Sequence, residues 1–288
     1  MTRATRETDA LTPFVFDAAN LRGALVTLSA TNRGVLASHR YPASVAHALS
    51  ELCAAATLIA STLKLDGSLI LQVAGRGPVR LVVVECTDTL SLRATAQWDD
   101  ASTASLSAGP TLAELAGADG ARFTITLDPR SGPMYQGIVA LQTTTIARLI
   151  EHYLTTSEQL QSRLLLDVRG DDAAGVLLQK LPGTTANDEA TWARASASLD
   201  DEPPLLGRAT HRDTLSALFP EDDLRVFASR PTRYACSCSV ERVCNALRIA
   251  GAAEIEAAIA ERGDVEVVCE FCNRRYEFSP AQAREIVS

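Results

Sequence analysis

The stretch that decides the organisation of this chain runs from residue 234 to 278 and contains Cys236-Ser237-Cys238 and Cys269-Glu270-Phe271-Cys272. Thirty residues separate the two cysteine pairs, which is enough for a helical insert. Each pair places two sulfurs on one tight turn, and two such turns can face each other around a tetrahedral metal ion. The spacing therefore predicts one Zn²⁺ held by these four thiolates, with no evident open position for a hydrolytic water.

Helices and strands are predicted around these cysteines. Ser239 is placed to cap a helix, and a second helix is expected to stop at Gly263. Short strands at 265–268 and 275–278 flank the second cysteine pair. The apolar face of the first helix is expected to contain Val240, Val243, Cys244 and Leu247. So few large apolar side chains make a poor core, and structural zinc contributes roughly 10–16 kcal/mol in small zinc modules. We therefore expect the module to unfold when the metal is removed.

Residues 1–183 have the pattern of an α+β domain with mainly antiparallel sheets. Alternating and β-branched runs predict strands at 23–29, 69–74, 79–86, 90–97, 122–127 and 135–141, and further apolar runs at 164–168 and 176–181 complete the domain. Helices are predicted from Pro42 to the residue before Asp66, at 112–115, at 143–154 and at 157–163, the last with a capping box of Thr155 and Glu158. Strands 69–97 should form an antiparallel meander.

The segment Gly75-Arg76-Gly77-Pro78 lies inside this meander. It has some likeness to a phosphate-binding loop, but Arg80 stands where a dinucleotide fingerprint needs glycine. A further strand also follows it where such a loop needs a helix. The segment is therefore expected to be a hairpin turn.

Residues 184–230 form a connector of different character. The part from 184 to 201 is small and polar, with Trp192 and Leu199 as its large apolar residues, and Pro203-Pro204 interrupts it. A helix is expected at 210–218. Short helices of such composition are marginal by themselves, so the connector is predicted to be weakly helical and metastable. Residues 231–288 then form the small zinc-binding domain.

Charge and composition narrow the classes of partner. The chain has 27 lysines and arginines against 35 aspartates and glutamates, a formal charge of −8. This balance disfavours nucleic acid and anionic membranes. The first twelve residues are polar and charged, so we expect no secretory signal and a cytoplasmic location. In a reducing compartment seven cysteines favour metal or redox chemistry over permanent disulfides, and Cys53, Cys86 and Cys244 are expected to be packed thiols.

Three functions fit a closed four-thiolate module. The first is a purely structural zinc ribbon. The second is a thiol–disulfide oxidoreductase using Cys269 and Cys272, although such motifs normally open a helix after a strand. The third is a switch, in which oxidation of the thiolates releases zinc and removes the stability that the metal supplied.

The chain resembles the redox-regulated molecular chaperones of the heat shock protein 33 family over nearly its whole length. In the C-terminal module the resemblance rests on the four cysteines with their thirty-residue interval, Glu241-Arg242 and Asn245-Ala246-Leu247. In the first domain it rests on Gly75-Arg76-Gly77-Pro78, Tyr135-Gln136-Gly137-Ile138-Val139, Ser157-Glu158-Gln159-Leu160 and Leu177-Leu178-Gln179-Lys180-Leu181-Pro182. It is the combination of these segments that makes the resemblance specific.

The resemblance implies an ATP-independent holdase without enzymatic activity, inactive when reduced and zinc-bound. It implies that Cys236, Cys238, Cys269 and Cys272 are the metal ligands and that they pair on oxidation as Cys236–Cys238 and Cys269–Cys272. Zinc release would then unfold the module and the connector. Unfolding client proteins are the implied partners, with a homodimer in the oxidised form as part of the response to oxidative stress. Cys53, Cys86 and Cys244 have no role in the family's set of four.

Overall fold

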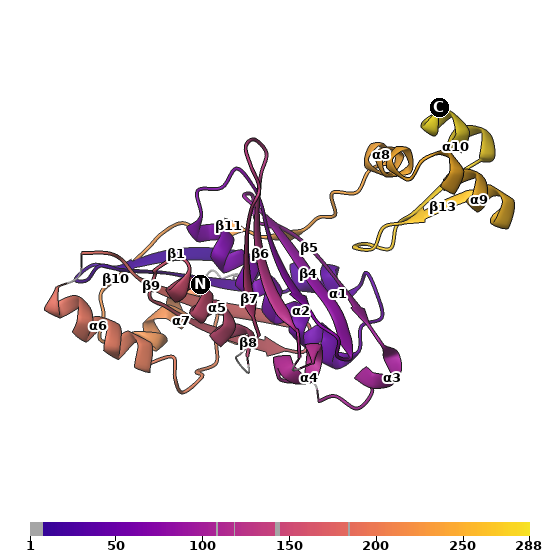
Figure 1. Ribbon diagram of the computed structural model, residues 1–288. Helices are drawn as coiled ribbons and strands as arrows, with labels where there is room; N and C mark the ends of the chain where they lie inside the picture. The colour runs from indigo at the N-terminus through magenta and orange to yellow at the C-terminus, as the bar shows by residue number, and fades with distance from the viewer. Residues whose placement is uncertain (1–7, 108, 118, 142–144, 184) are drawn as a thin grey trace, which may run out of the picture. The chain divides into compact units, whose positions relative to one another are not determined.

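The computed structural model describes residues 8–107, 109–117, 119–141, 145–183 and 185–288. The chain divides after Tyr234 into two compact units, which are described separately. The first contains two six-stranded, mostly antiparallel sheets, and the second contains a two-stranded sheet with helices (Figure 1). The α+β class predicted from the sequence is confirmed.

The first sheet has the strand order β10-β1-β2-β9-β8, and β11 also pairs with β1. Every strand pair in it is antiparallel. Its strands are β1 (Ala10–Phe16), β2 (Leu21–Leu28), β8 (Ser162–Arg169), β9 (Asp172–Lys180), β10 (Leu224–Val226) and β11 (Arg230–Pro231). The sheet therefore combines strands from both ends of the first unit.

The second sheet has the order β12-β5-β4-β3-β6-β7. The strands are β3 (Gly67–Ala74), β4 (Val79–Thr87), β5 (Ser91–Trp98), β6 (Arg122–Pro129), β7 (Tyr135–Ala140) and β12 (Arg233–Tyr234). Strands β3, β4 and β5 form the predicted antiparallel meander. β12 pairs with β5 in parallel, so the last residues of the first unit are held at this sheet's edge.

The turn at Gly75–Pro78 is a hairpin turn, as predicted, and it serves as a docking point for α4 (Leu112–Ala116). The backbone N–H groups of Arg76 and Gly77 both donate to the Ala116 carbonyl oxygen at 2.9 Å. A Cβ atom at Gly75 would lie 1.9 Å from that same oxygen. The amide groups that a phosphate loop would offer to a ligand are thus used within the fold.

Helix α2 (Ala43–Thr62) is the central helix of the first unit. It contacts strands of both sheets, among them β4 and β9, and Leu49 and Leu52 are completely buried. The helix is long and apolar enough to cross a membrane, but 78% of its most apolar window is buried inside the fold, as in a core helix. The remaining helices before the connector are α1 (Ala30–Leu36), α3 (Asp100–Thr103), α4 and α5 (Ile146–Thr156).

The predicted helix at 157–163, with its capping box of Thr155 and Glu158, is wrong. Helix α5 continues through Thr155 to Thr156, and the Glu158 carboxylate accepts a hydrogen bond from the Tyr153 hydroxyl at 2.8 Å. From Ser162 the chain pairs with β9. Pairing of the apolar residues after Ser162 with β9 stabilises the chain more than a short helix with this cap would. The start of the preceding predicted helix, residue 143, lies outside the described residues.

The connector packs on the first sheet. Its helices are α6 (Ala186–Ala197) and α7 (His211–Leu218), and both lie along this sheet in Figure 1. Side chains of β2 and β9 alternate between the two faces of the sheet. Val26 and Leu177 belong to the same buried cluster as α2. A second cluster joins Phe14, Phe16, Leu25, Val176 and Leu178 to the connector residues Leu199, Leu205, Leu215, Leu218 and Phe219. The connector thus covers the face of the sheet that α2 leaves free.

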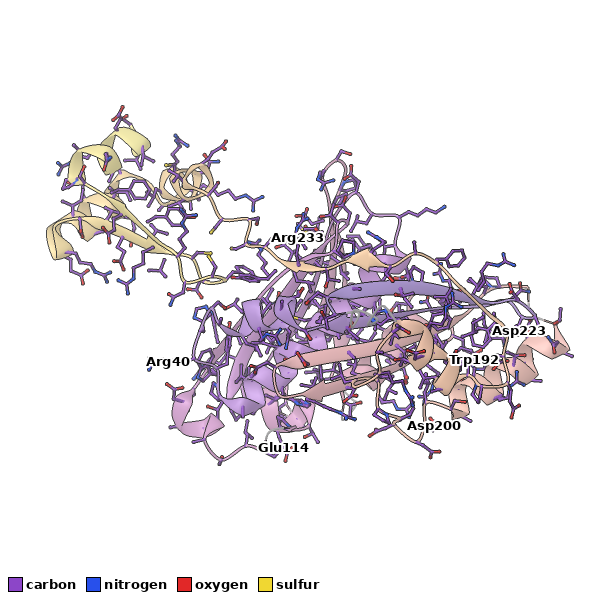
Figure 2. The ribbon with its side chains drawn as sticks, turned by 180° about the vertical axis from the view of Figure 1, so that it is seen from behind. Arg40, Glu114, Trp192, Asp200, Asp223 and Arg233 are labelled. Carbon is purple, nitrogen blue, oxygen red and sulfur yellow. The ribbon has the colours of Figure 1, made fainter. Side chains whose placement is uncertain are left out.

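Several polar contacts attach the connector to this sheet. The Asp167 carboxylate on β8 accepts hydrogen bonds from the backbone N–H groups of Leu205 and Leu206 at 2.9 and 3.1 Å. The Arg163 side chain pairs with Asp200, which is labelled beside Trp192 in Figure 2. His211 at the start of α7 makes side-chain hydrogen bonds through both ring nitrogens, to Thr12 and to Thr27.

Replacing Gly75 by alanine should destabilise the first unit, because the new Cβ cannot avoid the Ala116 carbonyl oxygen. We expect a loss of about 2 kcal/mol or more in the free energy of unfolding, typical of forced overpacking. Thermal and urea unfolding would measure it. Gly109→Ala is the control, since a Cβ there meets its nearest neighbour at an ordinary 3.6 Å. Equal stability of both variants and the parent would contradict this account of the turn.

Glu51 on α2 should make stability depend on pH. Burial raises the pKa of its carboxyl from an ordinary 4.5 to about 7. The unfolded chain therefore loses this proton first as pH rises, and the free energy of unfolding falls between those two values. Glu51→Gln should remove this decline and stabilise the protein at pH 8 by up to ~3 kcal/mol. Urea unfolding at pH 5 and pH 8 checks it, and an unchanged pH profile would refute it.

Candidate metal centre

The first cysteine loop, residues 235–239, leads directly into helix α8 (Val240–Ala250). Ser239 is the N-cap of this helix, and its hydroxyl accepts a hydrogen bond from the Arg242 backbone N–H at 3.2 Å, as predicted. The Arg242 guanidinium also donates to the Ser237 hydroxyl at 2.8 Å. Both bonds fix the loop against the start of the helix, which sets the positions of Cys236 and Cys238.

The second cysteine loop, residues 269–274, is the turn between β13 (Val265–Val268) and β14 (Arg275–Phe278). The Cys269 N–H donates to the Arg274 carbonyl oxygen at 2.9 Å, and the Asn273 N–H donates to the Cys269 carbonyl oxygen at 2.8 Å. Asn273 has a φ of 57°, a left-handed conformation that asparagine tolerates better than most residues. This tight turn places Cys269 and Cys272 next to each other.

The two loops bring all four predicted cysteines together. The sulfur atoms of Cys236, Cys238, Cys269 and Cys272 all lie within 4.8 Å of one another. Contacts of 3.7 Å join Cys236 to Cys269, and contacts of 3.4 Å join Cys238 to Cys272. A tetrahedral metal with sulfur ligands at about 2.3 Å requires sulfur separations of about 3.8 Å. The donor set and its spacing therefore fit a metal ion such as Zn²⁺.

The thiols in this cluster differ in acidity. Burial alone raises the pKa of Cys238, but hydrogen bonds from Tyr276 and Cys272 lower it overall to about 7. Burial and the neighbouring sulfurs raise the pKa of Cys272 to about 12, and burial also raises that of Cys236. Once one sulfur is ionised, the others hold their protons more tightly. A divalent cation would offset that repulsion and allow all four to bind as thiolates.

The apolar core around the cluster is small. Its buried residues are Val243, Leu247, Ile255, Val265, Tyr276, Phe278 and Ala283, and Cys238 and Cys269 pack against them. The prediction that Val240 shares this apolar face is wrong, because its side chain is 56% exposed. Helix α9 (Ala252–Arg262) ends at Gly263 in a left-handed conformation, as predicted. The metal ligands would thus be part of the core itself.

Helix α10 (Pro280–Val287) was not predicted from the sequence, and it completes this core through the fully buried Ala283. The signal was present. Ser279 and Gln282 form a capping box, and Pro280 occupies the first turn, where a missing N–H has no cost.

The remaining three cysteines do not belong to the cluster. Cys53 and Cys86 are completely buried in the first unit, and burial raises the pKa of both thiols, that of Cys86 to about 12. They are packed thiols, as predicted. Cys244 on α8 is partly buried against the apolar core of the second unit and is not one of the four clustered cysteines.

Comparison with known proteins agrees with this architecture. The family model described as "Hsp33 protein" matches residues 9–279. The 33 kDa chaperonin of Chromobacterium violaceum is 41% identical over 283 residues, covering 96% of this chain and 93% of that protein. The 33 kDa chaperonin of Pseudomonas syringae pv. tomato is 39% identical over 282 residues, covering 95% and 91%.

A solved structure has a similar fold. The crystal structure of the 33 kDa chaperonin (heat shock protein 33 homolog) from Thermotoga maritima superimposes with a TM-score of 0.80 at 22% identity, covering 97% of this chain and 98% of that one. The family model spans almost the whole sequence and the curated relatives are similar over nearly their full length. On this evidence, the chain belongs to the Hsp33 protein family.

Proposed function

We propose that this protein is a redox-regulated, ATP-independent holdase that is inactive when reduced and zinc-bound. The observation that carries the proposal is the packing of clustered cysteines into a small core. A unit built in this way depends on the state of its sulfurs. Family membership supports the chaperone activity, since relatives are named 33 kDa chaperonins.

The proposed metal is a single Zn²⁺ held by Cys236, Cys238, Cys269 and Cys272. When bound, it supplies structural cross-linking of the two cysteine loops. Four sulfur donors without histidine or carboxylate suit zinc in a closed structural site, which leaves no position for a catalytic water.

Oxidation is proposed to form the Cys236–Cys238 and Cys269–Cys272 disulfides. Formation of each disulfide removes two electrons from two thiolates, and both electrons pass to the oxidant. Either disulfide alone would remove two of the four ligands. The metal would then leave, and the small apolar core would not hold the second unit folded.

The proposed response continues from the zinc domain, residues 231–288, into the metastable connector, residues 184–230. Residues 224–234 hold their place through three short strands on β1 and β5. Loss of order in the adjoining unit would favour their release, followed by that of α6 and α7. The apolar face beneath, which includes Phe14, Phe16 and Leu178, would be exposed to bind unfolding client proteins.

The same proposal places the protein in the cytoplasm, with a homodimer in the oxidised state and neither nucleic acid nor membrane as partner. The net charge of −8 supports the last point. An oxidoreductase function for Cys269 and Cys272 is less well supported, because their loop connects two strands and does not begin a helix.

Oxidation should release zinc and activate the protein together. The reduced protein is expected to contain one zinc per chain, and peroxide with mild heat should release it, remove four free thiols and produce aggregation suppression. Cys269→Ser should abolish stoichiometric zinc binding and unfold residues 235–288, while Cys244→Ser should leave zinc content unchanged. Zinc content, thiol titration and light scattering of an unfolding client provide the readouts. Zinc retained after oxidation, or full activity in the reduced protein, would exclude the switch.

The connector should be easier to release when Asp167 is replaced by asparagine. The change weakens the hydrogen bonds from the Leu205 and Leu206 backbone N–H groups. The free energy needed to release the connector locally should fall by about 1–3 kcal/mol. Hydrogen exchange in the reduced protein should accelerate across the connector while zinc content stays constant. Asp171→Asn, in the exposed turn of the same hairpin, is the matched control. Unchanged exchange in Asp167→Asn would mean that this carboxylate does not hold the connector.

A further inference from the structure

Tyr276 makes a contact with the cysteine cluster that the metal ligands alone do not explain. Its hydroxyl donates a hydrogen bond to the Cys238 sulfur at 3.1 Å, short for a bond to sulfur. The side chain is only 6% exposed, so water does not compete freely for this bond. The contact is therefore a built feature of the second unit.

The position of Tyr276 is fixed from several sides. It lies on β14 opposite Val267 of β13, and its ring belongs to the buried apolar cluster. The Arg274 guanidinium lies 5.3 Å from the ring centroid, which makes the phenol a stronger hydrogen-bond donor. β14 follows directly from the second cysteine loop, whereas Cys238 belongs to the first. The hydrogen bond consequently joins the first loop to the strand that follows the second, independently of any metal.

We propose that Tyr276 is a positioning residue that sets how readily the centre is oxidised, by holding the Cys238 sulfur and withdrawing electron density from it. The inference rests on the proposed zinc switch and names a residue that regulates it. Hydrogen bonds from surrounding groups orient metal ligands and adjust their basicity. Tyr276 does this for one sulfur of the four, so the cysteines of the first loop are not equivalent.

The chemistry gives the direction of the effect. In oxidation by hydrogen peroxide, a thiolate lone pair attacks one peroxide oxygen, the O–O bond breaks, and hydroxide leaves to give a sulfenic acid. A neighbouring thiolate then attacks that sulfur, displaces hydroxide and forms the disulfide. A hydrogen bond to the attacking lone pair stabilises the thiolate more than the transition state, because negative charge leaves the sulfur during attack. Tyr276 should therefore slow the first step.

Tyr276→Phe removes the hydroxyl and keeps the ring in the apolar cluster. In the full-length reduced protein, peroxide-driven zinc release should be about three- to tenfold faster than in the parent. Replacing zinc by Co²⁺ gives a second readout, since the thiolate-to-cobalt charge-transfer band should move to longer wavelength when the sulfur becomes more electron-rich. The matched control is Tyr153→Phe, which deletes a tyrosine hydroxyl bonded to Glu158 in the first unit.

The inference holds if Tyr276→Phe speeds zinc release and moves the cobalt band to longer wavelength while Tyr153→Phe changes neither. It fails if Tyr276→Phe binds metal like the parent, with an unshifted band and an equal or slower release rate. It also fails if the rate rises equally in both variants, because general destabilisation then accounts for it. Absence of stoichiometric metal in the parent protein would instead refute the proposed zinc site, so the two failures can be told apart.

Discussion

The first sheet is apolar on both faces, and the rest of the first unit is arranged to cover it. Along β9, Val176 and Leu178 face one side and Leu177 faces the other, and all three are fully or almost fully buried. A sheet of this kind needs a layer on each side to keep these residues from water. Helix α2 supplies one layer and the connector supplies the other. The connector is thus a necessary part of the reduced structure although its own sequence is only weakly apolar.

The second unit depends on a different constraint. Its apolar cluster is small, and two of the four clustered cysteines pack against it. Hydrophobic burial and sulfur chemistry therefore act on the same residues, since moving a sulfur also disturbs the core. The tyrosine that donates to Cys238 belongs to that core as well. A closed four-thiolate site placed at the surface of a large domain would not have this consequence.

Much of this could be predicted because its signals are local. The cysteine spacing predicted that the four sulfurs cluster. The alternation of apolar and polar residues predicted strands β3 to β7 with nearly correct ends. The failures have physical causes. Strand β1 was not predicted, because Pro13 interrupts its apolar run and proline normally argues against a strand. The Pro13 carbonyl oxygen nevertheless accepts a hydrogen bond from the Phe227 N–H. Strands β10, β11 and β12 have two or three residues each, which is too short to show the alternating pattern of a strand. They form only because the edges of β1 and β5 are available for pairing. The bond from Tyr276 to Cys238 spans residues far apart in sequence, and no spacing rule indicates it.

The separation of the two apolar clusters in the first unit bears directly on the proposed activity. The cluster around α2 extends through the second sheet, and none of its buried residues belongs to the cluster under the connector. Removing the connector would therefore uncover Phe14, Phe16 and their neighbours without opening the core beside α2. A holdase needs such an arrangement, because exposed apolar surface binds clients only while the domain that presents it stays folded. The connector helices are short, at 12 and 8 residues, against 20 in α2, and short helices depend on packing for their stability. Under the proposed function the connector would therefore be released first, and the sheet beneath it would retain its structure.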